Sequence, residues 1–125
     1  MIGSTRNVRV FAATAPTNMH YGIEALELRA RADLGRDPMS GDLFLFVSKN
    51  RRRAKVLYFD GTGMCLFYKR LDKGRFAELW RDGDRRLELT MTELTLFLEG
   101  SHLVGRFPVS PTPIGEKELE ITISK

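Results

Sequence analysis

Three short apolar runs between residues 37 and 76 constrain the fold of this chain more than any other feature. They are Leu43–Val47, Val56–Phe59 and Met64–Tyr68, each rich in aromatic and branched side chains and too short for a helix. The second and third runs are separated by Asp60-Gly61-Thr62-Gly63, whose glycines can adopt the positive φ angles of a tight hairpin. The pattern therefore predicts a three-stranded antiparallel meander.

The segment before the meander predicts a strand and a helix. Val8–Ala12 alternates loosely and is typical of a short strand, and Thr17 or Asn18 is placed to cap the helix that follows. Gly35 is placed to end that helix. Its apolar face is predicted to carry Ile23, Leu26, Ala30 and Leu34, which have helical spacing.

The segment after the meander predicts a short strand and a second helix. Residues 76–80 indicate either a further short strand or an irregular apolar plug, and Leu87–Leu89 indicates a brief edge strand. Thr90 and Glu93 have the spacing of a capping box, which predicts a helix that begins there and ends at Gly100.

The predicted fold class is therefore α+β: a small antiparallel β-meander of about four to six strands packed by two α-helices. We expect one domain over residues 1–107, since 125 residues are the length of a single domain with its own core. Residues 108–125 predict a proline-linked carboxy-terminal strand or tail, because Leu119, Ile121 and Ile123 alternate with polar residues.

Composition narrows the class of protein. No apolar run approaches the roughly 20 residues that span a bilayer, and the first residues lack the apolar core of a secretory signal. We therefore expect a cytoplasmic protein without membrane contact. Cys65 is the single cysteine, which excludes an internal disulfide and a cysteine-rich zinc site, and we expect it to be a buried, inert thiol.

Positive charge is concentrated in the centre of the chain. The net charge is +4, yet residues 49–55 carry five basic groups and no acid, and residues 69–86 carry seven basic groups against four acids. Such a cluster indicates a polyanionic partner, nucleic acid before membrane, or alternatively a solvated loop that keeps the protein soluble. The candidate nucleic-acid-binding residues are Lys49, Arg51, Arg52, Arg53, Lys55, Lys69, Arg70, Lys73 and Arg75.

Aromatic residues lie between these charges and could stack on exposed bases. Since side chains of a strand alternate between two faces, about half of the rings must face the core. We expect Phe59 and Phe67 to lie in the core. For Tyr58 and Tyr68 the pattern does not decide between the core and an exposed face.

Catalytic patterns are absent from the sequence. His20 and His102 have no metal-ligand spacing, and no HExxH, GxSxG, phosphate-loop pattern or clear acidic triad occurs. Asp60 is explained by its place at a hairpin turn. The sequence thus predicts a protein that is not an enzyme and that needs no metal or cofactor.

The order of these motifs resembles a known family, the TnpB (Orf2) accessory proteins of the insertion sequence IS66 transposon family. The similarity rests on Asp37-Pro38-Met39-Ser40-Gly41-Asp42-Leu43-Phe44-Leu45-Phe46, on Lys55 to Leu71 with its Asp60-Gly61-Thr62-Gly63 turn, on Gly74-Arg75-Phe76 and on Leu98-Glu99-Gly100. Asn18-Met19-His20-Tyr21-Gly22 is similar to the family's amino-terminal segment, although Asn18 and His20 replace its usual acidic and basic residues. The similarity covers roughly residues 8 to 102.

The resemblance implies a non-catalytic accessory protein for DNA transposition, which acts beside a separate transposase. The basic loop between the first two strands of the meander, residues 48–53 with Lys55 just beyond, then suggests binding to DNA or to the transposase–DNA complex. The alternative is a protein–protein adaptor that docks on the transposase, or on another element-encoded accessory protein, without DNA contact. On that view residues 119–123 or an apolar sheet face would form the contact, and a second copy of the chain could also pair there. A third alternative is a relic that keeps the fold without supporting transposition.

Overall fold

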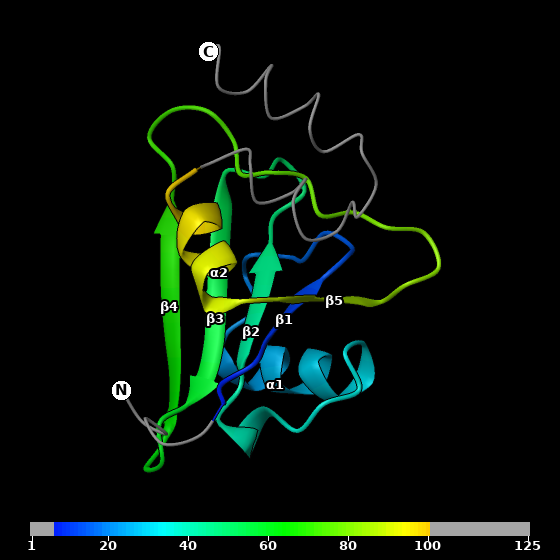
Figure 1. Cartoon of the computed structure of the whole chain (residues 1–125), viewed down its shortest axis with the longest axis vertical. Coiled ribbons are helices and arrows are strands. Elements are labelled where there is room, and N and C mark those ends of the chain that lie inside the picture. Colours follow the sequence, from blue (N-terminus) through cyan, green and yellow to red (C-terminus); the bar gives the residue numbers. More distant parts are fainter. Residues whose placement is uncertain (1–6, 101–125) are drawn as a thin grey trace.

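A computed structural model of the chain describes residues 7–100. Its elements are β1 (Val10–Ala13), α1 (Ile23–Ala32), the 3-10 turn η1 (Pro38–Ser40), β2 (Leu43–Val47), β3 (Arg53–Phe59), β4 (Met64–Arg70), β5 (Arg86–Leu89) and α2 (Met91–Leu98). They form a five-stranded sheet with two helices (Figure 1), which confirms a small single-domain α+β fold. The predicted strand at residues 119–123 lies outside the described residues. Within the described range, no helix is long and apolar enough to cross a membrane.

The strands lie in the spatial order β4-β3-β2-β1-β5. β2, β3 and β4 pair antiparallel in chain order, which confirms the predicted meander. The expectation of a wholly antiparallel sheet is wrong, because β1 pairs parallel with β2 and places Phe11 opposite Phe44. Parallel neighbours need a long crossover, and α1 supplies it. β5 pairs antiparallel with the other edge of β1.

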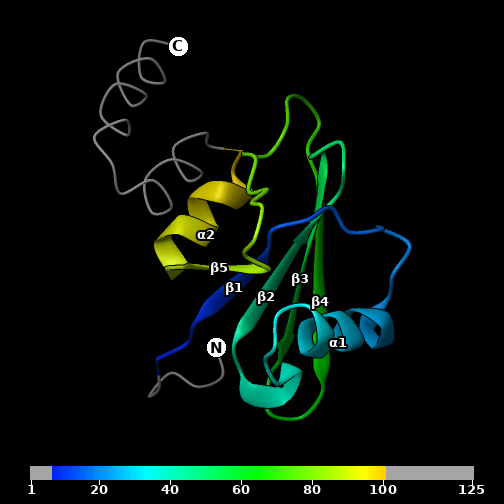
Figure 2. The ribbon, with the colours of Figure 1, turned by 90° about the vertical axis from the view of Figure 1, so that its right-hand side faces the viewer.

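The two helices cover opposite faces of the sheet (Figure 2). Side chains of a strand alternate between these faces, so each face buries its own apolar cluster. The cluster under α1 comprises Phe11, Ala13, Leu26, Ala30, Leu34, Phe44, Phe46 and Leu57. The cluster under α2 comprises Val10, Ala12, Leu43, Leu45, Val47, Ala54, Val56, Phe76, Ala77, Leu79, Leu89, Leu94 and Phe97. Among the predicted face residues of α1, Leu26, Ala30 and Leu34 are fully buried.

The start of α1 differs from the prediction. Thr17 and Asn18, the expected caps, lie before the helix, whose N-cap is Gly22. Asn18 forms a separate turn instead: its Oδ1 accepts a hydrogen bond from the backbone N–H of His20 at 2.8 Å. Its carbonyl oxygen also accepts from the N–H of Tyr21 at 3.1 Å. An asparagine can stabilise a turn as well as a helix start, and the sequence did not distinguish the two uses.

The start of α2 confirms the predicted capping box. The Oγ1 of Thr90 accepts from the N–H of Glu93 at 3.1 Å, and the Glu93 carboxylate accepts from the N–H of Thr90 at 2.7 Å. Gly100 follows the helix with a φ of 86°, a left-handed conformation that favours glycine. Leu87–Leu89, expected as an edge strand, lies in β5.

Residues 76–80 form the irregular apolar plug, not a strand, and Phe76 and Leu79 are fully buried under α2. The ring centroids of Phe76 and Phe97 lie 4.9 Å apart in a stacked arrangement.

The expectation that Phe67 is a core residue is wrong, since 45% of it is exposed. Phe67 lies on the edge strand β4, and the buried cluster under α2 ends at β3. Phe59 is half-buried.

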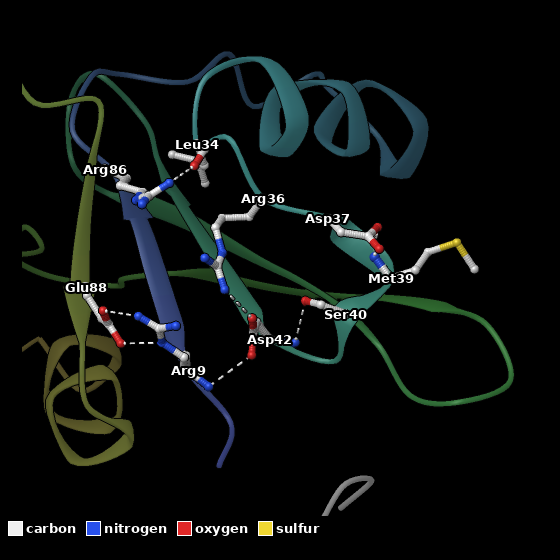
Figure 3. A network of polar contacts seen from close by, with 9 residues as sticks. All are labelled: Arg9, Leu34, Arg36, Asp37, Met39, Ser40, Asp42, Arg86 and Glu88. Carbon is white, nitrogen blue, oxygen red and sulfur yellow. Dashed lines mark hydrogen bonds and ion pairs between the residues drawn. The ribbon is translucent and has the colours of Figure 1, made fainter. Parts of the chain in front are cut away.

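A polar network ties β1 and β5 to the turn before β2 (Figure 3). The guanidinium of Arg9 donates to both carboxylate oxygens of Glu88, at 2.8 and 2.9 Å. The carboxylate of Asp42, which is 2% exposed, accepts from the backbone N–H of Arg9 at 3.2 Å and from Arg36 at 3.4 Å. Arg86 donates to the carbonyl of Leu34 at 2.6 Å. These charged side chains bond to other groups of the protein, so the network has a structural role in joining β1, β5 and the turn before β2.

Candidate nucleic-acid interface

The basic loop between β2 and β3 is held rigidly by its own polar side chains. The hydroxyl of Ser48, which is buried, donates to Oδ1 of Asn50 at 2.8 Å and accepts from the N–H of Arg53 at 3.1 Å. Oδ1 of Asn50 also accepts from the N–H of Arg52 at 3.0 Å. Cations on a loop of fixed shape lose less conformational entropy on binding than cations on a mobile loop.

Arg51 joins this loop to the apolar plug. Its φ of 59° is unusual for a residue with a side chain, and its N–H donates to the carbonyl of Ser48 at 2.9 Å. Its guanidinium donates to the carbonyl of Phe76 at 3.1 Å, and its own carbonyl accepts from the N–H of Phe76 at 2.6 Å. Arg51 thus has a structural task beside its charge.

Two predicted site lysines also serve the fold. The ammonium of Lys55 donates to the carbonyls of Met19 and Tyr21, each at 2.8 Å, and so fixes the segment before α1 onto β3. The ammonium of Lys69 donates to the carbonyl of Leu98 at 2.6 Å, at the end of α2, where the helix dipole favours a cation. Each of these lysines has fewer donors left for a ligand.

The remaining candidates face solvent. The side chains of Lys49, Arg53, Arg70, Lys73 and Arg75 are exposed and make no hydrogen bond or ion pair within residues 7–100. Arg52 makes one long contact, at 3.5 Å, with the carbonyl of Asp72. We call Lys49, Arg52, Arg53 and Arg70 the basic corner, because they line two adjoining hollows at one end of the sheet.

Arg53 and Arg70 are cross-strand partners on β3 and β4, so their side chains lie on the same face of the sheet. The next pair on that face is Lys55 and Tyr68. The Lys55 ammonium lies 5.6 Å from the centroid of the Tyr68 ring, which is 49% exposed. A third hollow beside the basic corner is lined by Arg53, Lys55 and Tyr68 together with Met19, His20 and Leu66. The arrangement places an exposed ring in the same hollow as the free cation of Arg53, as single-stranded nucleic-acid sites do.

Sequence reasoning missed several residues that the fold brings near the basic corner. Met19 and His20 precede α1 and carry no local signal, and their place depends on the hydrogen bonds from Lys55 and on the bond from the N–H of Thr17 to the carbonyl of Val47. Arg29, Arg81 and Arg85 line a larger groove that adjoins the same segment. Arg81 and Arg85 belong to the basic stretch 69–86, which the sequence identifies by its charge. Their position near α1 depends on the parallel pairing of β1 with β2, which the sequence does not indicate.

The acidic and thiol groups have structural explanations. No cluster of three or more histidine, cysteine, aspartate or glutamate residues suited to a metal occurs in the described part of the chain. Hydrogen bonds from Thr62 and Gly63 lower the pKa of Asp60 at the β3–β4 turn. Cys65, expected to be buried, is half-buried, and that burial raises the pKa of its thiol. A raised pKa leaves a thiol less reactive at neutral pH.

Comparison with known proteins identifies two relatives from one bacterial strain. The chain is 39% identical over 100 residues to the uncharacterized protein y4hO of Sinorhizobium fredii (strain NBRC 101917 / NGR234). The aligned residues cover 80% of this chain and 86% of the relative. The chain is 38% identical over 101 residues to the uncharacterized protein y4jC of the same organism, covering 80% and 85%. No solved structure matches the chain significantly.

A family match carries more information than these relatives, because both relatives are uncharacterized. Residues 8–106 match the family described as IS66 Orf2-like protein. This range contains the whole sheet, both helices and the basic corner. The chain belongs to the IS66 Orf2-like family of insertion-sequence proteins.

Proposed function

We propose that this protein is a non-catalytic accessory factor of IS66-type transposition that binds DNA through the basic corner. Membership of the IS66 Orf2-like family supports an accessory role in transposition. The observation that carries DNA binding is the set of unpaired cations around one rigid loop, with Arg53 and Arg70 facing each other. A fold gains nothing from two adjacent like charges, so their placement favours an anionic ligand.

The phosphate backbone of DNA is the natural ligand for such a surface. Flexible cations contact phosphates without reading sequence, and each contact releases counterions, so the affinity falls with salt. The neighbouring hollow with Tyr68 offers a ring on which an unpaired base can stack. The proposal therefore includes both duplex backbone and exposed bases as contacts.

The test is a DNA-binding titration of the full chain at several salt concentrations, with duplex and single-stranded oligonucleotides. Arg53→Ala and Arg70→Ala should each weaken binding and reduce the slope of log K against log salt by about 0.9 for duplex DNA. The matched control is Arg31→Ala, because Arg31 is 56% exposed on α1 and lines none of these hollows. It should leave the slope unchanged.

Three results would contradict the proposal: no binding at low salt, equal loss in all three variants, or an unchanged slope in Arg53→Ala and Arg70→Ala. The last would mean that the basic corner is a solvated surface. Circular dichroism of each variant must show an intact fold, so that lost binding reports the interface.

A second candidate function is a protein–protein adaptor that docks on the transposase. One observation favours it: within residues 7–100, β4 pairs with a strand on one side only, and it exposes Phe67 and Tyr68 on its two faces. An exposed edge strand with apolar side chains is a template for strand addition.

The adaptor function predicts that the purified transposase of the same element binds this chain after nuclease treatment. Phe67→Lys should abolish that interaction while leaving DNA binding intact. If capture of the transposase disappears with nuclease, DNA mediates the contact and the adaptor function is rejected.

A further inference from the structure

A groove lies at the carboxyl end of β1, next to the hollow that contains Lys49 and Arg53. It has a volume of about 610 Å³, within the roughly 300–1,000 Å³ of small-ligand sites. α1 contributes one wall and the loop at 81–85 the other. The groove is lined by Ala13, Thr14, Ala15, Pro16, Thr17, Asn18, Tyr21, Arg29, Asp33, Arg81, Gly83, Asp84 and Arg85.

The loop wall is anchored to the end of β1 by the buried residue Thr14. Its N–H donates to the carbonyl of Arg85 at 3.3 Å, and its carbonyl accepts from the N–H of Arg81 at 3.1 Å. Its hydroxyl donates to the carbonyl of Asp84. Three hydrogen bonds thus hold the loop in one place, and the groove is preformed.

The helix wall is held equally well. The guanidinium of Arg29 donates to the Tyr21 hydroxyl at 3.2 Å and to the Asp33 carboxylate at 3.2 Å. It also lies 5.4 Å from the centroid of the Tyr21 ring. The Tyr21 hydroxyl accepts from Arg29, so its own proton is free to be donated to a ligand.

The remaining donors suit an anion. The guanidinium of Arg81 makes a single 3.5 Å contact with the carbonyl of Trp80, and that of Arg85 makes one 3.2 Å bond to the carbonyl of Ala32. A guanidinium has five N–H donors, so most of these remain available. Asn18 uses its Oδ1 in the turn, which leaves its amide N–H groups able to bond a base edge.

The groove continues into the basic corner. Thr17 and Asn18 line both the groove and the adjoining hollow that contains Lys49 and Arg53. Four residues from Thr17 to His20 span at most about 10 Å, and DNA rises about 3.4 Å per nucleotide along a strand. A strand whose phosphates lie on the basic corner can therefore reach the groove within about three or four nucleotides.

We propose that this groove binds one unpaired nucleotide of a DNA strand that leaves a duplex held at the basic corner. The inference rests on the proposed DNA binding and adds the kind of DNA that is recognised. Bases in a duplex are stacked and cannot enter a groove of this kind, whereas the last bases of a single-stranded extension can. Arg81 and Arg85 bind the phosphate, and Asn18 and Tyr21 meet the base.

The experiment compares blunt duplex DNA with the same duplex carrying a six-nucleotide extension at its 3′ or 5′ end, by fluorescence anisotropy with the full chain. The wild-type protein should bind one extended duplex at least about five-fold more tightly, as expected for an added base contact. Arg81→Ala should remove this preference and keep blunt-duplex binding. Ala15→Glu should do the same, because it places a carboxylate at an exposed position in the groove.

A control variant in the basic corner distinguishes a loss of all DNA binding from a loss of the preference for an extension. Arg52→Ala should weaken binding to blunt and extended DNA by a similar factor, so the preference remains. Absence of all DNA binding would overturn the proposed function. Equal affinity of the wild type for blunt and extended DNA would overturn only this inference.

Free 2′-deoxyadenosine monophosphate distinguishes a strand end from a free nucleotide. If it binds the wild-type protein as tightly as the extended duplex does, the groove is a mononucleotide site and the inference is wrong. If the preference for an extension survives both Arg81→Ala and Ala15→Glu, the groove is not where the extension binds, and the inference is also wrong.

Discussion

Arg53 and Arg70 lie directly opposite each other on β3 and β4, with no acidic partner for either side chain in the described residues. Like charges in opposite positions destabilise an antiparallel pair. This pair therefore opposes folding and favours binding of an anion.

We predict that Arg70→Thr raises stability by a few tenths of a kcal/mol, up to about 1 kcal/mol, while it weakens DNA binding. Urea unfolding and the salt titration measure the two effects in one preparation. Lys49→Thr is the matched control, because Lys49 has no cross-strand partner, and its unfolding midpoint should stay the same. A destabilised Arg70→Thr would show that the arginine stem contributes more by packing than its charge costs.

Lys55→Met should destabilise the protein although it removes a cation from a basic surface. The change keeps an unbranched stem, one atom shorter, and removes both hydrogen bonds to the carbonyls of Met19 and Tyr21. We expect a cost of about 2–3 kcal/mol and a melting temperature lower by roughly 10 °C. Thermal unfolding followed by circular dichroism measures this.

Lys49→Met is the companion variant, since its ammonium makes no bond within residues 7–100. Its melting temperature should not change. If the two lysine variants melt alike, the Lys55 bonds contribute nothing to stability.

Asp42→Ala should cost about 2–3 kcal/mol, because it removes the carboxylate that accepts from Arg9 and Arg36 at the buried start of β2. Asp42→Asn should cost less, since the amide oxygen can still accept the backbone N–H of Arg9. Urea unfolding of both variants gives the order. Equal stabilities for the two would mean that the oxygen at this position is not what matters.

Acid should weaken the link between β1 and β5. The hydrogen bond from Arg9, together with its charge, lowers the pKa of Glu88 below the ordinary 4.5. The folded protein then binds this proton less readily than the unfolded chain does. The contribution to stability is complete above about pH 4.5 and is lost as the pH falls through the lower folded pKa.

The measurement is urea unfolding of wild type and Glu88→Gln from pH 7 to pH 3. The wild type should be more stable at pH 7, and the difference should shrink toward pH 3. Glu78→Gln is the control, because Glu78 makes no ion pair in the described part of the chain, and its curve should run parallel to the wild type. A difference that grows as the pH falls would contradict the assignment.

The elements with strong local signals were predicted well from sequence. The Asp60-Gly61-Thr62-Gly63 turn fixed the β3–β4 hairpin, and the reciprocal spacing of Thr90 and Glu93 fixed the start of α2. The parallel pairing of β1 with β2 has no local signal, because it joins segments separated by a helix. Period-two alternation likewise assigned Phe67 to a face, yet it could not show that this face is uncovered at β4.

The candidate site was likewise predicted only in part from the sequence. The sequence indicated where positive charge accumulates, but not which cations the fold itself uses. Lys55 and Lys69 are bonded to backbone carbonyls, whereas Arg53 and Arg70 are free, and all four lie on the same two strands. Arg29 carries no functional signal in the sequence, because the groove exists only after α1 has crossed from β1 to β2.

The position of β1 in the sheet has a consequence for synthesis on the ribosome. β1 emerges first, yet its outer neighbour β5 pairs Leu89 with Val10, so that edge stays open until almost all the described residues have been made. The apolar face under α2 stays uncovered for equally long. A nascent chain that stalls after β4 therefore exposes an apolar sheet face and an unpaired strand edge together. Such surfaces are prone to aggregation and are bound by chaperones. A chain translated through α2 can cover both the edge of β1 and this apolar face.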